Sequence, residues 1–259
     1  MLIDALEAYL TPASPLARRF GFVHHSVALK RRALKQKAAW ATHITNCQTV
    51  LRNVVDELSS LNHIVILGSS HLFEVDKQDL LRFKKITLVD LVHPLSVRRW
   101  AKKNPQVQLI EADLSGYLAK LQTIPTTSVF FELLKEQVAP FYFEADLVVS
   151  SNLLSQLHLT ALTHLERKSA LSLQQKNQIG QLSAENHLRF LKQCPGKHLV
   201  YSDRQAIYFD QLGNETGRSQ YPVDFGDYSL LQEWQWDIAP LGEAHREQSI
   251  AMLVQAYID

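Results

Sequence analysis

Three short apolar runs, each followed by a residue suited to a turn, constrain the fold of this chain more than any other feature. The runs are HIVIL before Gly68, ITLV before Asp90 and VQLIEA before Asp113. They are rich in β-branched residues, and segments long enough for a helix separate them. Near-continuous apolar strands that alternate with helices predict a mainly parallel sheet covered on both faces. The expected fold class is therefore α/β and doubly wound.

The same alternation continues along the chain and sets the expected elements. Parallel strands are expected at 64–67, 86–91, 107–110, 146–150 and 198–202. Helices are expected at 26–60, 75–83, 94–103 and within the polar region 159–193. A short strand at 206–210 and an antiparallel pair at 230–238 and 247–258 are expected at the far edge of the sheet. Residues 1–60 then form an N-terminal helical extension, and residues 61–259 form the sheet domain.

The composition is that of a globular protein with reduced thiols. Hydrophobic residues make up 46% of the 259, and no apolar run approaches the roughly 20 residues of a membrane span. The first ten residues carry acids and no basic stretch, which is untypical of a secretory signal. Cys47 and Cys194 lie far apart with no C-x-x-C motif. We therefore expect a cytoplasmic protein with no membrane association and no metal site.

The basic residues are unevenly distributed, although the net charge is only +1. Residues 11–55 hold eight Lys or Arg and no acid. One interpretation is a patch that faces phosphate groups, as on RNA. The other, which we favour, is a solvated helix face beside a more acidic remainder.

The spacing between Gly68 and Asp90 indicates a ligand site. The two residues are 22 positions apart, and a glycine turn followed about 20 residues later by a carboxylate is typical of a mononucleotide-binding βαβ unit. Each residue also has a purely structural interpretation, because Gly68 suits a tight turn and Asp90 and Asp113 suit caps. All three together, in order and at strand ends, favour a nucleoside-type ligand.

These segments resemble the class I S-adenosylmethionine-dependent methyltransferases over residues 63–258. ILGSS (66–70) resembles the glycine-rich loop of that family, and DLVVSSNLLSQL (146–157) resembles its fourth-strand segment. WATHITNC, LVDLVHP and WQWDIAPLGE are similar to a bacterial group of methyltransferase-like proteins of unassigned substrate. The resemblance implies a Rossmann-like, mainly parallel seven-stranded sheet with an antiparallel closing strand.

The resemblance also implies a cofactor and its contacts. S-adenosylmethionine is the expected cofactor, with Asp90 on the ribose hydroxyls and Asp113 near the adenine. Ser151 and Asn152 would position the methyl acceptor as candidate catalytic residues. The full set of expected cofactor-binding residues is Gly68, Ser69, Ser70, Asp90, Leu91, His93, Asp113, Leu114, Ser150 and Gln156.

The chain departs from the family pattern at the first strand. Its loop holds one glycine, and Ser69 and Ser70 stand where further small residues are expected. No acid lies late in the strand, and Glu74 or Asp76 is the nearest replacement.

The extension supplies two further candidates. Trp40 and His43 share one helix face at a spacing of three residues, where they would form a lid over the cofactor or, alternatively, part of the core.

The sequence therefore predicts a methyltransferase with an unidentified acceptor. A small-molecule acceptor is favoured over RNA because the overall charge is near neutral. The alternatives are a non-catalytic methyltransferase-like binding module, an RNA methyltransferase that uses the basic 11–55 region, and a nicotinamide-dependent enzyme. The oligomeric state is not predicted.

Overall fold

The computed structural model describes residues 2–136, 141–221 and 223–259, and its centre is one mixed sheet. Strands β1 (His63–Leu67), β2 (Lys85–Asp90), β3 (Val107–Glu111), β4 (Leu147–Ser151) and the first half of β5 (Lys197–Phe209) run parallel. Strand β8 (Ser249–Ile258) pairs antiparallel with β5, and β7 (Ser229–Ala239) pairs with β8 at the edge. The order is β3-β2-β1-β4-β5-β8-β7, which confirms the predicted fold class.

Two strand predictions differ from the structure. The expected short strand at 206–210 is the second half of β5, because β5 continues past an irregularity between Asp203 and Gln205 to Phe209. An unpredicted strand, β6 (Glu215–Gln220), forms a hairpin with that half of β5, so the sheet has eight strands. The expected antiparallel pair does lie at the far edge, as β7 and β8.

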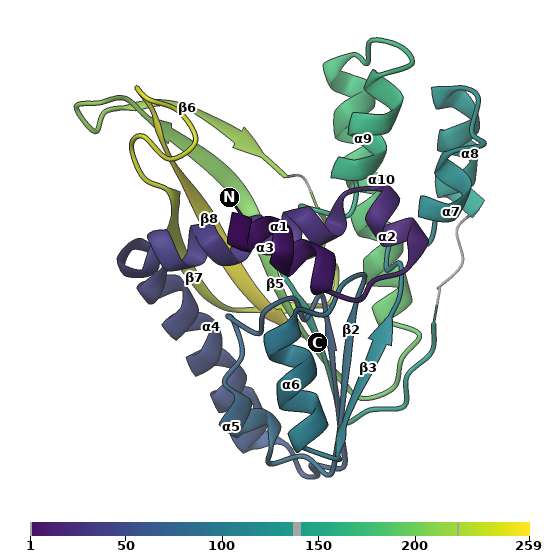
Figure 1. Cartoon of the computed structure of the whole chain (residues 1–259), viewed down its shortest axis with the longest axis vertical. Coiled ribbons are helices and arrows are strands. Elements are labelled where there is room, and N and C mark those ends of the chain that lie inside the picture. Colours follow the sequence, from purple (N-terminus) through teal and green to yellow (C-terminus); the bar gives the residue numbers. More distant parts are fainter. Residues whose placement is uncertain (1, 137–140, 222) are drawn as a thin grey trace.

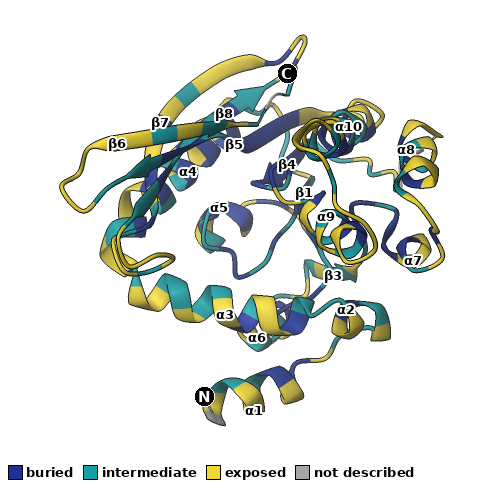
Figure 2. Cartoon of the chain, turned by 90° about the horizontal axis from the view of Figure 1, so that it is seen from above, coloured by how far each residue is buried: buried dark blue, intermediate teal, exposed yellow. Residues whose placement is uncertain are grey.

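Helices cover both faces of the sheet (Figures 1 and 2). Helices α4 (Lys37–Glu57), α5 (Lys77–Leu80) and α6 (Leu95–Lys103) share one apolar core with the sheet. Helix α10 (Leu173–Leu191) packs on the opposite face. Helices α7 (Leu118–Leu121), α8 (Thr127–Glu136) and α9 (Leu159–Glu166) form a further cluster with Ile179 of α10. The sheet is therefore buried on both sides, as its apolar strands predict.

The N-terminal extension contains four helices. Helices α1 (Leu2–Leu10), α2 (Pro15–Arg19) and α3 (Phe22–Lys35) precede α4, and the predicted helix over 26–60 is broken at Gln36. The apolar side chains of α1–α3 pack on Leu91 and Val92, which follow β2. These helices therefore cross the carboxyl ends of the parallel strands, as Figure 1 shows.

Two other helix predictions are shortened by capping. The region 159–193 divides into α9 and α10, because Ser172 and Gln175 form a capping box that starts a new helix. The helix expected at 75–83 is only the short α5, whose first turn is capped by the Asp76 carboxylate.

The strand order fixes where a ligand can bind. Strand β1 pairs with β2 on one side and with β4 on the other. The chain therefore reverses its direction of travel across the sheet between these strands. Open α/β sheets bind ligands beyond the carboxyl ends of the strands at such a switch point. Asp90 is the last residue of β2, and Gly68 and Asn152 directly follow β1 and β4.

Candidate functional site

The turn that ends β1 is tied to the end of β2. The backbone N–H groups of Gly68 and Ser69 donate to the Val89 carbonyl oxygen at 2.9 and 3.3 Å, and the Ser70 N–H donates to Asp90 Oδ2 at 2.8 Å. Gly68, Ser70 and Leu72 have positive φ values of 73°, 39° and 60°. Such strain in non-glycine residues is concentrated at functional sites. The structure thus brings together the two residues whose spacing indicated a ligand.

The Asp90 carboxyl retains capacity to bind a ligand. Its Oδ1 accepts a long hydrogen bond of 3.4 Å from the Val92 N–H, and a carboxylate oxygen can accept two hydrogen bonds. Burial raises the pKa of Asp90, while the N–H groups of Ser70, Val92 and Leu91 act in the opposite direction. Ligand hydroxyl groups that donate to Asp90 would stabilise its charged form in this buried environment.

Asp113 is occupied by its own loop. Its Oδ1 accepts the Ser115 N–H at 2.9 Å and the Ser115 hydroxyl at 2.5 Å, and its Oδ2 accepts the Leu118 N–H at 2.8 Å. This is the capping role that the purely structural interpretation of Asp113 predicts. Leu114 is buried in the core cluster beneath α10, and an adenine contact by either residue stays a prediction.

The residues after β2 also have partners within the chain. Leu91 packs against the extension. His93 is fully buried, and its Nε2 lies 3.0 Å from the Ile110 carbonyl oxygen. Burial lowers the pKa of His93 to about 4, so the imidazole is neutral at physiological pH. A cofactor contact by His93 stays a prediction.

The candidate residues at the end of β4 and after it bond to different elements. Ser150 is fully buried and its hydroxyl lies 2.8 Å from Nε2 of His187 on α10. Asn152 has a φ of 50°, and its Oδ1 accepts the Asp203 N–H at 3.2 Å. Gln156 is exposed, and its side-chain amide returns to the Asn152 carbonyl oxygen at 2.9 Å. Asn152 therefore bonds to β5, whereas Ser150 bonds to α10 on one face of the sheet.

Gly68 has a packing role as well. A Cβ added to Gly68 would lie 2.7 Å from Leu153 Cδ2 and 3.1 Å from the Ser151 carbonyl oxygen. The absence of a side chain thus lets the segment after β4 approach the end of β1 closely. Part of the space that glycine leaves is taken by Leu153.

The two lid candidates lie against β7. Trp40 is 2% exposed, its indole N–H donates to the Ile238 carbonyl oxygen at 3.1 Å, and it packs within the main core. His43 stacks on Trp236 with ring centroids 4.0 Å apart. Their proposed contact with a cofactor is untested.

Helix α3 of the extension contacts the loop after β1. Its Ser26 carbonyl oxygen lies 2.9 Å from Nε2 of His71, which belongs to the loop after β1.

Sequence reasoning missed Asp203 on β5. Its side chain is buried, and Ser155 donates its hydroxyl proton to Asp203 Oδ2 at 2.8 Å. A signal was available, since Asp203 directly follows the apolar run HLVYS, as Asp90 follows ITLV. Glu74, considered only as a replacement acid, lies close by, with Oε1 3.9 Å from Nε2 of His43.

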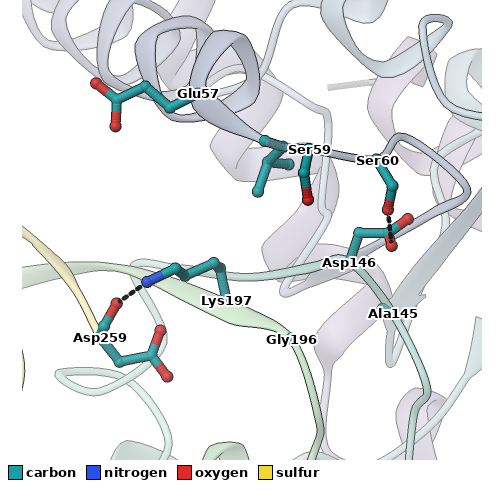
Figure 3. Close-up of a pocket in the computed structure, with 9 residues that line it drawn as sticks. Glu57, Ser59, Ser60, Ala145, Asp146, Gly196, Lys197 and Asp259 are labelled. Atoms are coloured by element: carbon teal, nitrogen blue, oxygen red, sulfur yellow. Dashed lines mark hydrogen bonds between the residues drawn. The ribbon is translucent and has the colours of Figure 1, made fainter.

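A surface hollow lies at the other end of the sheet (Figure 3). It has a volume of about 650 Å³ and is lined by residues that precede or begin β1, β4 and β5, including Ser60, Asp146 and Lys197. Asp146 there accepts the Ser60 hydroxyl and the N–H groups of Asn62 and His63. This hollow lies at the amino ends of the strands, away from the switch point.

Within the described residues, no group of three or more His, Cys, Asp or Glu side chains is arranged to hold a metal ion. In the same part of the chain, no helix combines the length and apolar character needed to cross a membrane.

Comparison with known proteins gives matches among solved structures alone. No protein-family model and no curated protein sequence matches the chain. A 1,6-didemethyltoxoflavin-N1-methyltransferase from Burkholderia thailandensis is 11% identical, with 89% of each chain covered and a TM-score of 0.40. The N-methyltransferase NodS from Bradyrhizobium japonicum is 11% identical, with 82% of this chain and 87% of that chain covered and a TM-score of 0.35.

A third match is the magnesium protoporphyrin IX methyltransferase of Synechocystis, at 8% identity. It covers 86% of this chain and 82% of that chain, with a TM-score of 0.40. The strand order of this chain, with β8 antiparallel between β5 and β7, is the sheet that the resemblance implies. The fold is therefore a Rossmann-like, mainly parallel sheet closed by antiparallel strands.

Proposed function

We propose that this chain is an S-adenosylmethionine-dependent methyltransferase that acts on a small-molecule acceptor. The observation that carries the proposal is the link between Ser70 and Asp90 at 2.8 Å. It holds a strained turn and a carboxylate side by side at the switch point of the sheet. The acceptor itself is not identified.

The residues present fit the nucleoside part of this cofactor. Asp90 Oδ1 can accept ribose hydroxyls, and the buried Ser69 hydroxyl has no hydrogen-bond partner among the described residues. Bound S-adenosylmethionine would supply an activated methyl group. Asn152 and Ser151, at the end of β4, would position the acceptor, and α3 would help to exclude water.

A non-catalytic methyltransferase-like module is the second candidate. It is favoured by the contact of Leu153 with Gly68 and by the loop hydrogen bonds that occupy Asp113. Both features use expected cofactor groups for the protein's own packing. This candidate predicts the same fold without cofactor affinity.

Methylation of RNA is less well supported, because acids neutralise much of the basic region. Lys30 pairs with Glu7 at 2.8 Å, and Arg31 pairs with Asp4 at 3.2 Å. Acidic residues of α1 therefore neutralise two of the basic residues of α3. Lys35 pairs with Glu243 at 2.6 Å. We expect a weak, strongly salt-dependent shift with bulk RNA that a triple charge reversal at Arg31, Arg32 and Lys35 changes little.

Calorimetric titration with S-adenosylhomocysteine tests the proposal. We expect saturable binding to the wild-type protein and an affinity about tenfold to hundredfold lower for Asp90→Asn, because hydrogen bonds to a charged acceptor are lost. Asp227→Asn is the matched control, since the Asp227 side chain is 96% exposed. Absence of binding to a folded wild-type protein would favour the non-catalytic module.

A further inference from the structure

A group of polar side chains from four segments lies beside the proposed cofactor turn. We define the Asp203 cluster as Asp203 of β5, His43 of α4, Glu74 of the loop after β1, and Asn152 after β4. Asn152 connects the two regions, because its Oδ1 accepts the Asp203 N–H at 3.2 Å and the neighbouring Leu153 packs on Gly68. None of the cluster except Asn152 is used in the proposed function.

The histidine of the cluster has a defined tautomer. The Trp234 indole nitrogen lies 3.1 Å from Nδ1 of His43, and an indole N–H can only donate. Nδ1 is therefore the acceptor, and a neutral His43 carries its proton on Nε2. That nitrogen lies 3.9 Å from Glu74 Oε1, which is beyond hydrogen-bonding distance.

The cluster has an unpaired acceptor. Asp203 is 4% exposed, and its Oδ1 has no hydrogen-bond partner among the described residues. Burial is the largest cause that raises the pKa of Asp203, and Glu74 raises it further, whereas Ser155, His43 and Asn152 lower it. A buried carboxylate oxygen without a donor is costly unless a ligand supplies one.

The acidic groups of the cluster outnumber its basic groups. Two carboxyl groups, Asp203 and Glu74, share the cluster with a single imidazole. The adjacent Arg204 is directed elsewhere, because its guanidinium lies 5.0 Å from the centroid of the Phe225 ring. The Glu74 side chain is 20% exposed, which leaves one side of the cluster accessible from solvent.

We infer that the Asp203 cluster binds a protonated amino group of the acceptor molecule. An ammonium offers N–H donors to the unpaired Asp203 oxygen and a positive charge to the two carboxyl groups. Neutral alcohols lack the charge, and carboxylates would be repelled. The inference rests on the proposed function in that it assigns this amine to the methyl acceptor.

A simple amine tests this inference without the cofactor. Trp234 and Trp236 contact His43 directly, so tryptophan fluorescence at pH 7.5 and constant ionic strength reports on the cluster. We expect a saturable change with n-butylamine hydrochloride, and binding at least about tenfold weaker for n-butanol and for butyrate. Equal responses to the amine and the alcohol would overturn the inference.

Two variants locate the amine. Asp203→Asn is isosteric and is expected to weaken n-butylamine binding about tenfold or more, and Glu74→Gln about threefold or more. The partly exposed Glu74 carries the test by itself if Asp203→Asn does not fold. Asp227→Asn is the control, with unchanged binding expected. Wild-type affinity in the folded cluster variants would contradict the inference.

A parallel titration separates this inference from the proposed function. S-adenosylhomocysteine is expected to bind Asp203→Asn as it binds the wild-type protein, because Asp203 is not among the residues expected to contact the cofactor. Cofactor binding without amine binding would overturn the amine site and leave the methyltransferase proposal standing. Amine binding without cofactor binding would overturn the methyltransferase proposal and retain the amine site.

Discussion

Asn152 and Asp203 are joined by a hydrogen bond from the Asp203 backbone N–H to the Asn152 side-chain oxygen, at 3.2 Å. This bond connects the residue after β4 with the point where β5 passes its irregularity. It requires Asn152 to keep a φ of 50°, a left-handed conformation that asparagine tolerates better than most residues. The bond thus fixes one wall of the candidate site.

Substitutions at Asn152 should separate the backbone effect from the side-chain effect. Asn152→Ala loses the acceptor of a buried N–H and keeps the positive φ, so we expect unfolding free energy to fall by about 2–3 kcal/mol. Asn152→Gly also loses the acceptor but relieves the strain, and should be about 1 kcal/mol more stable than Asn152→Ala. Urea unfolding measures both, and equal stabilities would contradict the assigned backbone conformation.

Gly68→Ala should lower the unfolding free energy more than Gly213→Ala does. Both glycines have a positive φ, but only the Cβ added at Gly68 would meet a close neighbour. Its Cβ would lie 2.7 Å from Leu153 Cδ2, and we expect a loss of roughly 2–4 kcal/mol from strain and overpacking together. Gly213→Ala is the control, because Gly213 has a φ of 82° and no neighbour within 4 Å of the added Cβ. Similar losses for both variants would argue against the close contact between β1 and the segment after β4.

The buried His187 should make the unfolding free energy fall in mild acid. Burial lowers the pKa of His187 to about 4, whereas an unfolded chain has a histidine pKa near 6.5. The unfolded state therefore binds more protons between these values. The contribution of His187, roughly 3 kcal/mol, is fully present above pH 6.5 and is lost as the pH falls towards 4.

The His187→Gln variant isolates this contribution. Unfolding free energy from urea titrations at pH 7.5, 6.5, 5.5 and 4.5 should decline less steeply for His187→Gln than for the wild type. His24→Gln is the control on the exposed surface of α3 and should retain the wild-type slope. A wild-type slope in His187→Gln would show that other groups cause the decline.

The hydroxyl of Tyr201 should contribute to the attachment of α4 to the sheet. It donates to the Cys47 carbonyl oxygen at 2.7 Å from a fully buried position. We expect Tyr201→Phe to lower the unfolding free energy by about 1 kcal/mol, measured by urea unfolding. Tyr142→Phe, at a residue 61% exposed, should leave stability unchanged, and an equal effect would contradict the role of the hydroxyl.

Features that depend on local sequence were predictable here. Apolar runs that end in Gly68 and Asp90 determine strand ends, and parallel strands bring such ends to one edge. The break at Gln36 was not predictable, because no glycine or proline lies between Phe22 and Glu57. It arises from tertiary contacts, since α3 bonds to α1 and Glu243 while α4 packs on β7.

Tertiary contacts also decide features of the candidate site that the sequence does not reveal. Helical spacing places Trp40 and His43 on one face, but it does not say which neighbour they meet, and that neighbour is β7. Asp203 was missed because β5 changes from parallel to antiparallel pairing along its length. The sequence indicates a strand end before Asp203, but it does not reveal that Asn152 and Ser155 bond to Asp203 there.

The contacts of α4 have a consequence for synthesis of the chain. Trp40 bonds to Ile238 and His43 bonds to Trp234, across 198 and 191 positions. At roughly 5–20 residues per second, a ribosome needs on the order of 10–40 s to make β7 after α4 has emerged. For that time Trp40 and His43 lack their β7 partners, so this part of the 21-residue helix completes its packing only when the last hairpin has been made.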